Sequence, residues 1–210
     1  MVEAWQRLGP EILQHSLEHL GLVLASMGMA IALGVPLGIV LTRQEGWRRW
    51  VLGVANVVQT IPSLALFGFL IPLPLIGGIG PRTAIVALIL YALLPIIRNT
   101  YVGILEVDPA VREAARGMGM TDWQLLTQVD LPLALASILN GIRVAAVIGV
   151  GVATIAAAVG AGGLGTFIFR GVAVVDHQLL LAGAVPAAFI ALMLDMVLGW
   201  VERWLKQGQA

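Results

Sequence analysis

The sequence has few charged residues and no cysteine, and both features narrow what the protein can be. Only 11% of its 210 residues are charged, whereas 59% are hydrophobic, and the mean hydropathy is +0.95. A soluble globule of this size needs more polar surface than that. The lack of cysteine excludes disulfides, thiol nucleophiles and thiolate metal sites. We therefore expect a chain that is covered largely by lipid.

Other absences exclude whole classes of function. The net charge is zero, so no basic excess attracts nucleic acid. Lys206 is the only lysine, and no phosphate-binding G-x-x-x-x-G-K-[ST] loop surrounds it. The segment 15–19 fits an H-x-x-E-H zinc pattern but lacks a third ligand, and no Ser-His or paired-carboxylate set lies at membrane depth. We expect no enzyme activity in this chain, no cofactor and no metal.

Long apolar runs predict the membrane spans. A helical span needs about 20 apolar residues. Five runs reach that length, at 20–41, 51–70, 83–105, 133–159 and 179–201. They show no two-residue alternation, which argues against a barrel. The sequence therefore predicts an all-α, polytopic membrane protein with five transmembrane helices.

The remaining segments complete a single predicted domain over 1–210. Apolar residues at helical spacing in 1–19 indicate an N-terminal interfacial helix lying on the membrane surface. The expected order is then helices one to three in 20–105, a polar coupling loop in 106–132, helices four and five in 133–201, and a tail in 202–210. Prolines within the spans, such as Pro62, can kink their helices.

Basic residues predict the orientation, because cytoplasmic loops are enriched in Lys and Arg. An odd number of spans puts the two termini on opposite sides. With the N-terminus outside, eight basic residues lie on the inner side and three on the outer side. The inner set is Arg43, Arg48, Arg49, Arg98, Arg112, Arg116, Arg203 and Lys206, and the outer set is Arg7, Arg82 and Arg170. We therefore expect the N-terminus outside and the C-terminus in the cytoplasm.

The polar stretch 106–132 carries the start signals of two short helices. Asp108 precedes a proline, which is typical of a helix N-terminus. Thr121 and Gln124 form a capping-box pattern that opens a second helix, and we expect Pro132 to close it. A cytoplasmic helix-turn-helix that projects from a small bundle indicates a docking element for a soluble partner.

The same stretch matches a family signature. The matching residues are Glu113, Ala114, Ala115, Arg116, Gly119, Val129, Leu131 and Pro132. Their spacing resembles EAA-x3-G-x9-I-x-LP, the signature of permease subunits of binding-protein-dependent ABC importers, with valine in place of isoleucine. Seven or eight positions at fixed gaps make this a specific pattern.

The resemblance implies a MetI-like fold and a transport subunit without its own ATPase site. It implies that the signature residues contact a cytoplasmic ABC ATPase dimer, with Glu113 and Arg116 offering charge-assisted contacts. The further partners that it implies are a second permease copy or a paralogue, an extracytoplasmic substrate-binding protein and membrane lipid. The implied location is the bacterial cytoplasmic (inner) membrane.

Three other segments resemble the osmoprotectant branch of this family. They are QTIPSLA at 59–65, LLPIIRNT at 93–100 and GAGGLG at 160–165. This branch imports glycine betaine, carnitine or choline, so the resemblance implies a quaternary-ammonium solute. Two alternatives stay open, namely an ABC permease for another small solute such as an amino acid, and a self-sufficient secondary transporter.

Polar residues within the apolar runs are candidates for function, because they are costly in a bilayer. Arg143 and Asp195 lie at similar depth from the cytoplasmic side, roughly 12 Å at about 1.5 Å per residue. We expect them to form a structural ion pair or to line the inner cavity. The candidates for the translocation path are the uncharged polar residues Gln59, Thr60, Ser63, Asn140 and Thr154.

Overall fold

The computed structural model describes residues 2–207, and the side chains of residues 8–205. No strand occurs in this part of the chain, which confirms the all-α class. In chain order the helices are α1 (Val2–Arg43), α2 (Glu45–Thr60), α3 (Ser63–Leu70), α4 (Pro81–Leu105), α5 (Pro109–Gly117), α6 (Asp122–Leu125), the π-turn η1 (Leu126–Asp130), α7 (Leu131–Ala156), the 3-10 turn η2 (Ala157–Val159), α8 (Gly165–Ala173) and α9 (His177–Gln207).

Four helical segments are long and apolar enough to cross a membrane. They are Leu8–Arg43, Pro81–Leu105, Asp122–Val159 and His177–Leu205. The pair α2 and α3 also passes this test as a unit, but it bends by 106°. Counting the bent pair as one span gives the five that were predicted.

The predicted second span is broken at Pro62, not merely kinked. Ile61 is extended, with ψ 126°, because a following proline disfavours the helical conformation. The Tyr91 hydroxyl of α4 donates a hydrogen bond to the Ile61 carbonyl, and Gln59 Nε2 donates to the Tyr91 carbonyl at 2.9 Å. These bonds give the Ile61 carbonyl a donor at the break and join the end of α2 to α4. The expectation of one continuous helix over 51–70 is corrected.

The bundle is built around α4, which packs against α1 on one side and α7 on another. Small residues allow the close approach. A Cβ added to Gly38 of α1 would lie 2.6 Å from Thr100 Cβ, and one added to Gly141 of α7 would lie 2.6 Å from Asn99 Cβ. Backbone contact through glycine is a common way to associate membrane helices, since lipid supplies no hydrophobic driving force between them.

The segment 1–19 is not a separate interfacial helix, because α1 runs unbroken through it. At about 1.5 Å per residue, its 42 residues exceed a hydrocarbon core of roughly 30 Å. The N-terminal part packs on protein: Glu18 Oε2 accepts the Gly163 N–H at 3.1 Å, and the rings of His15 and Phe167 meet edge to face. Side chains of residues 1–7 lie outside those described. The segment is therefore the first part of α1, which Glu18 joins to the turn before α8 and His15 joins to α8 itself, and this corrects the prediction of a separate helix.

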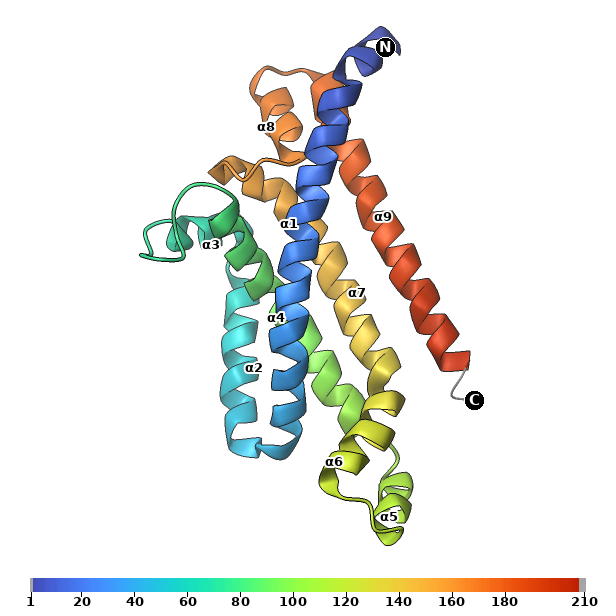
Figure 1. Ribbon diagram of the computed structural model, residues 1–210. Helices are drawn as coiled ribbons and strands as arrows, with labels where there is room; N and C mark the ends of the chain where they lie inside the picture. Colours follow the sequence, from blue (N-terminus) through green and yellow to red (C-terminus); the bar gives the residue numbers. More distant parts are fainter. Residues whose placement is uncertain (1, 208–210) are drawn as a thin grey trace.

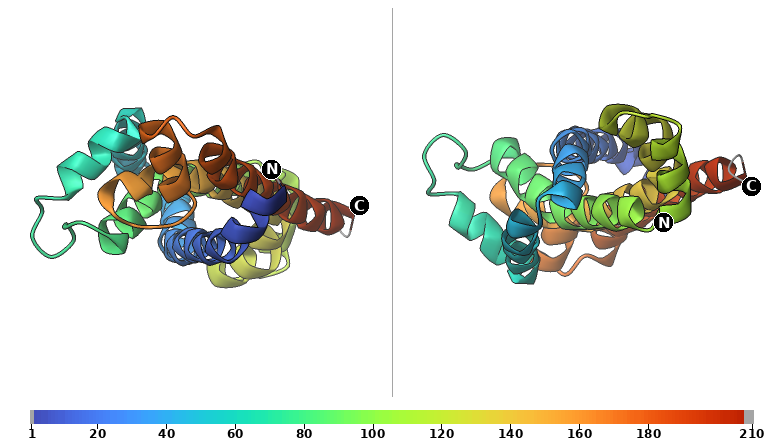
Figure 2. Two further views of the ribbon diagram at one scale, coloured as in Figure 1. Left: turned by 90° about the horizontal axis from the view of Figure 1, so that it is seen from above. Right: turned by 90° about the horizontal axis from the view of Figure 1, so that it is seen from below.

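The two ends of the bundle differ in what they carry (Figure 1). The helices α3 and α8 lie at the end nearer the N-terminus. The helices α5 and α6 project from the opposite end, beside the turn that joins α1 to α2. Seen along the bundle, α3 and the C-terminal end of α9 extend to opposite sides (Figure 2). The predicted tail 202–210 begins as helix, since α9 continues to Gln207, and 208–210 lie outside the described residues.

Pro132 does not close the second helix of the loop as expected. The helix passes from α6 through η1 into α7 as one run, Asp122–Val159. At this point the Leu131 N–H bonds the Leu126 carbonyl five residues back, which is the wider π spacing. A proline inside a helix collides with the preceding turn, and the wider turn just before Pro132 accommodates it. The loop is therefore continuous with the fourth predicted span.

Candidate functional site

The projecting unit formed by α5, α6 and their connecting turn, residues 109–125, has the local structure that the sequence predicts. The Asp108 carboxylate accepts the Ala110 N–H at 2.8 Å, which caps α5. Both arms of the capping box between Thr121 and Gln124 are present. Gly119 has a φ of +87° in the turn between the helices, a conformation that favours glycine. The helix-turn-helix prediction is confirmed at each of these positions.

The signature residues divide into a buried and an exposed set. Ala115 is 2% exposed and packs inward, and Val129 and Leu131 are half-buried. The exposed members of the signature are Glu113, Ala114, Arg116, Gly119 and Pro132. Glu113 and Arg116 lie three residues apart on one helix, so they share a face. That face presents one negative and one positive group to a partner.

Two apolar residues that the sequence analysis missed lie on the same projecting unit. Met118 is 73% exposed and Trp123 is 72% exposed. Large apolar side chains on a polar, protruding unit indicate a protein contact. Their positions in the sequence could have revealed them, because Met118 lies in the turn beside Gly119 of the signature and Trp123 lies in the first turn of α6.

Two arginines connect the projecting unit to the bundle. Arg112 Nε donates to Asp130 Oδ1 at 2.7 Å, and its Nη2 donates to the Ile104 carbonyl. Arg43, at the end of α1, lies 3.7 Å from Asp122 Oδ1 in a more exposed pair. Sequence reasoning had assigned both arginines only to the inner side of the membrane.

The structure brings Arg143 of α7 and Asp195 of α9 together. The guanidinium donates twice to the carboxylate, at 2.6 and 2.8 Å, and Glu202 Oε2 lies 3.5 Å from Nη1. A Cβ on Gly199 would come within 3.0 Å of the guanidinium. The lack of a side chain at Gly199 therefore leaves the space that Arg143 occupies, and this cluster joins the two helices.

The uncharged candidates for the path do not form one cluster. Gln59 bonds the α4 backbone, and Asn140 Nδ2 donates to Asn99 Oδ1 at 3.3 Å. Thr60 and Thr154 each bond a carbonyl of their own helix at 2.7 Å. Asn140 and Thr154 are separated by roughly 21 Å along α7, at about 1.5 Å per residue. Ser63 is half-buried at the start of α3.

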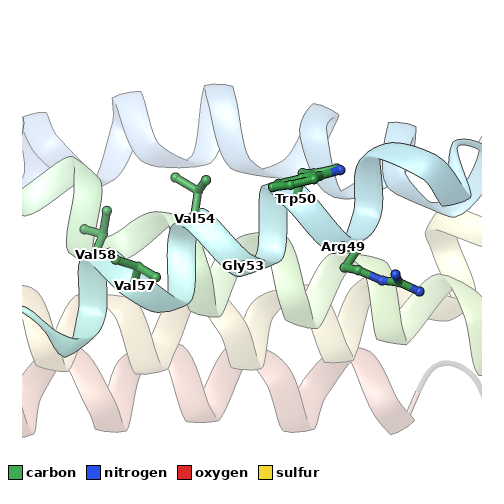
Figure 3. A pocket seen from close by; sticks show the side chains of 6 residues that line it. All are labelled: Arg49, Trp50, Gly53, Val54, Val57 and Val58. Carbon is green, nitrogen blue, oxygen red and sulfur yellow. The ribbon is translucent and has the colours of Figure 1, made fainter.

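An apolar pocket lies along the outward face of α2, and Figure 3 shows its six lining residues. They are Arg49, Trp50, Gly53, Val54, Val57 and Val58. Trp50, Val54 and Val57 are mostly exposed in the single chain. Such a face suits lipid or another membrane helix, because its only hydrogen-bonding side chains are Arg49 and the indole of Trp50.

Comparison with known proteins identifies the family. Residues 34–209 match the family described as "Binding-protein-dependent transport system inner membrane component". The carnitine transport permease protein OpuCB of Listeria monocytogenes is 44% identical over 202 residues, which cover 96% of this chain and 91% of that protein. The glycine betaine/carnitine/choline transport system permease protein OpuCD of Bacillus subtilis is 45% identical, covering 94% of this chain and 85% of that one.

A solved structure shares the fold. The chain superimposes on the MetNI methionine ABC transporter, in an inward facing conformation, with a TM-score of 0.84 and 25% sequence identity. The match covers 98% of this chain and 99% of the other. The helical arrangement described above is thus that of an ABC transporter membrane subunit.

Proposed function

The chain belongs to the family of binding-protein-dependent transport system inner membrane components, and on this basis we propose that it imports a quaternary-ammonium osmoprotectant. The solute is glycine betaine, carnitine or choline, in keeping with the relatives' names. The chain is the membrane permease of an ABC importer, and a separate subunit hydrolyses ATP. It is a multi-pass protein of the bacterial inner membrane.

The observation that carries this proposal is the exposed signature on the projecting unit. Glu113 and Arg116 form charge-assisted contacts with an ATPase subunit, and Met118 and Trp123 supply the apolar part of the contact. Movement of the ATPase subunits is then passed to α7, because α6 continues into it without a break. This arrangement requires the unit to face the cytoplasm, with the N-terminus outside.

The permease has few aromatic side chains placed to recognise a quaternary ammonium group, so recognition of this solute class falls to another subunit. Such a cation donates no hydrogen bond from nitrogen, and aromatic cages are its usual receptors. The five described tryptophans are all more than 60% exposed, namely Trp47, Trp50, Trp123, Trp200 and Trp204. We place solute selectivity in an extracytoplasmic substrate-binding protein. This chain contributes to the polar lining of the path through Gln59, Thr60, Ser63, Asn140, Arg143, Thr154 and Asp195.

A second membrane subunit, identical or paralogous, completes the permease. The exposed apolar face of α2 around Trp50, Val54 and Val57 is one surface that such a subunit or lipid covers. Two such permeases match the two subunits of an ATPase dimer, so each projecting unit contacts one of them. A translocation path between two membrane subunits also accounts for polar groups that remain scattered within one.

Reconstitution in proteoliposomes tests the proposal. The permease is combined with the candidate ATPase and receptor, and uptake of labelled glycine betaine, carnitine, choline and methionine is followed. We expect ATP-dependent uptake of at least one of the first three, and none without the ATPase. Uptake of methionine alone would favour the alternative of an amino-acid permease. Uptake without any ATPase, driven by an ion gradient, would indicate a secondary transporter.

A further inference from the structure

Arg112 joins three elements at the base of the projecting unit. It lies on α5, where its Nε donates to Asp130 Oδ1 at 2.7 Å. Its Nη2 donates to the Ile104 carbonyl in the last turn of α4. Asp130 is the last residue of the π-turn, at the start of α7. One guanidinium therefore spans the end of the third predicted span, the first coupling helix and the beginning of the fourth span.

This contact is shielded from water. The side chain of Asp130 is 7% exposed and that of Arg112 is 22% exposed. Buried pairs are screened by salt much less than exposed ones. The Ile104 carbonyl also accepts the Val107 N–H at 3.3 Å, and its place in the last turn of α4 favours a cation, because a helix C-terminus is electronegative. The planar fork of arginine reaches both acceptors at once, whereas the single ammonium of lysine does not match that geometry.

One face of α5 packs against the rest of the protein, and the other is exposed. Arg112 and Ala115 lie three residues apart and face inward, toward the π-turn and the bundle. Glu113 and Arg116 lie on the exposed face. The outer face is therefore free for the ATPase while the inner face holds the helix to the membrane helices. Besides this contact, α5 packs on α6 and η1.

We propose that Arg112 is the positioning residue that makes α5 move together with the ends of α4 and α7 when the ATPase moves. This inference rests on the proposed function. A force applied at Glu113 and Arg116 reaches the third predicted span through the Ile104 carbonyl and the fourth through Asp130. Without Arg112 the outer face of α5 still binds the ATPase, but α5 shifts without displacing the two spans to the same extent.

The test measures the number of ATP molecules hydrolysed per solute imported. Three variants are reconstituted with the ATPase and receptor: Arg112→Ala, Arg112→Lys and Asp130→Asn. We expect each to co-purify with the ATPase as the wild type does and to keep most of the ATP hydrolysis. Uptake should fall about tenfold in Arg112→Ala, a loss typical of coupling between sites. Arg112→Lys should lie between it and the wild type.

The controls separate this inference from a general loss of folding. Arg203→Ala removes an exposed arginine at the same membrane side, on α9, and should leave the ratio unchanged. If Arg112→Ala does not fold, the nearly isosteric Asp130→Asn and the charge-conserving Arg112→Lys decide the question. Proportional loss of co-purification, hydrolysis and uptake in those two variants, at an unchanged ratio, would overturn the proposal and leave a structural role.

The outcomes also distinguish this inference from the proposed function. If the wild-type chain imports solute only with ATP and its ATPase, but the variants keep the wild-type ratio, only the role of Arg112 is wrong. If the wild-type chain neither binds the ATPase nor needs ATP, the proposed function itself is wrong.

Discussion

The projecting unit and the membrane interior organise their polar residues differently. In the projecting unit, charged groups lie either on an exposed face, as Glu113 and Arg116 do, or in contacts between elements, as Arg112 and Asp130 do. In the interior, the charged pair Arg143 and Asp195 joins two helices, whereas the hydroxyls of Thr60 and Thr154 bond carbonyls of their own helices. On the proposed function, the docking surface lies within one chain, whereas a path between two membrane subunits leaves each subunit with part of its polar lining.

Of the changes considered, reversal of the charge at Glu113 in the projecting unit should reduce uptake the most. Glu113→Lys places a like charge against the positive group that we expect on the ATPase, which costs several kcal/mol at an interface. Co-purification with the ATPase should be lost, and ATP-dependent uptake with it. Glu106→Lys is the matched control, since it reverses an exposed carboxylate seven residues earlier, outside the signature. Equal losses in both variants would argue against a specific contact at Glu113.

Variants of Arg143 and Asp195 test whether the charges in the membrane interior stabilise the fold or belong to the translocation path. Asp195→Ala leaves Arg143 in the membrane with only Glu202 nearby, so the yield of folded protein should fall severalfold. The double variant Arg143→Leu with Asp195→Leu should recover most of that yield, measured by size-exclusion chromatography in detergent. If uptake recovers as well, the pair is structural. If folded protein returns without uptake, the pair belongs to the path.

Gly119→Ala should have a moderate effect confined to the projecting unit. The residue has a φ of +87° and open space around it, so the added methyl group brings backbone strain of about 1 kcal/mol without a steric clash. Uptake should fall by roughly fivefold while the solute concentration for half-maximal uptake stays the same. Gly117→Ala is the control, because Gly117 has equal space and ends α5 without a positive φ. A similar loss of uptake in Gly117→Ala would show that backbone strain at Gly119 is not the cause.

The smallest expected effect comes from the interior, at Asn140. Asn140→Ala removes a 3.3 Å hydrogen bond to Asn99, and one such bond contributes about 1 kcal/mol. The solute concentration for half-maximal uptake should rise by up to about fivefold, with ATPase binding unchanged. Thr154→Val, whose hydroxyl bonds only the Gly151 carbonyl, should change it less. A larger effect of Thr154→Val than of Asn140→Ala would indicate that the path lies nearer the C-terminal end of α7.

Local rules predicted the projecting unit well, because its signals lie within a few residues. The caps at Asp108 and Thr121 depend on partners two or three positions away, and both formed as expected. The contact between Arg112 and Asp130 joins positions 18 residues apart, and no local rule connects them. Equal membrane depth did bring Arg143 and Asp195 into consideration as a pair, but Glu202 entered only through the packing of α9.

Three expectations failed for identifiable physical reasons. The helical pattern of 8–19 does not show whether that helix is separate from the next one, so its continuity with the rest of α1 was missed. Pro62 was expected only to kink its helix, and Pro132 was expected to close the second helix of the loop. Pro62 became a 106° break, at which the Ile61 carbonyl accepts a hydrogen bond from the Tyr91 hydroxyl, and Pro132 was accommodated by the π-turn before it.

Site-specific cross-linking tests most directly whether the projecting unit contacts an ATPase inside the cell. The chain has no cysteine, so a single Met118→Cys exchange introduces one thiol at an exposed position. We expect this thiol to cross-link to the ATPase and to react with impermeant reagents only from the cytoplasmic side. Val175→Cys, exposed at the opposite end, should react from outside and form no such cross-link. Labelling of Met118→Cys from outside, or no cross-link in the active complex, would contradict the account.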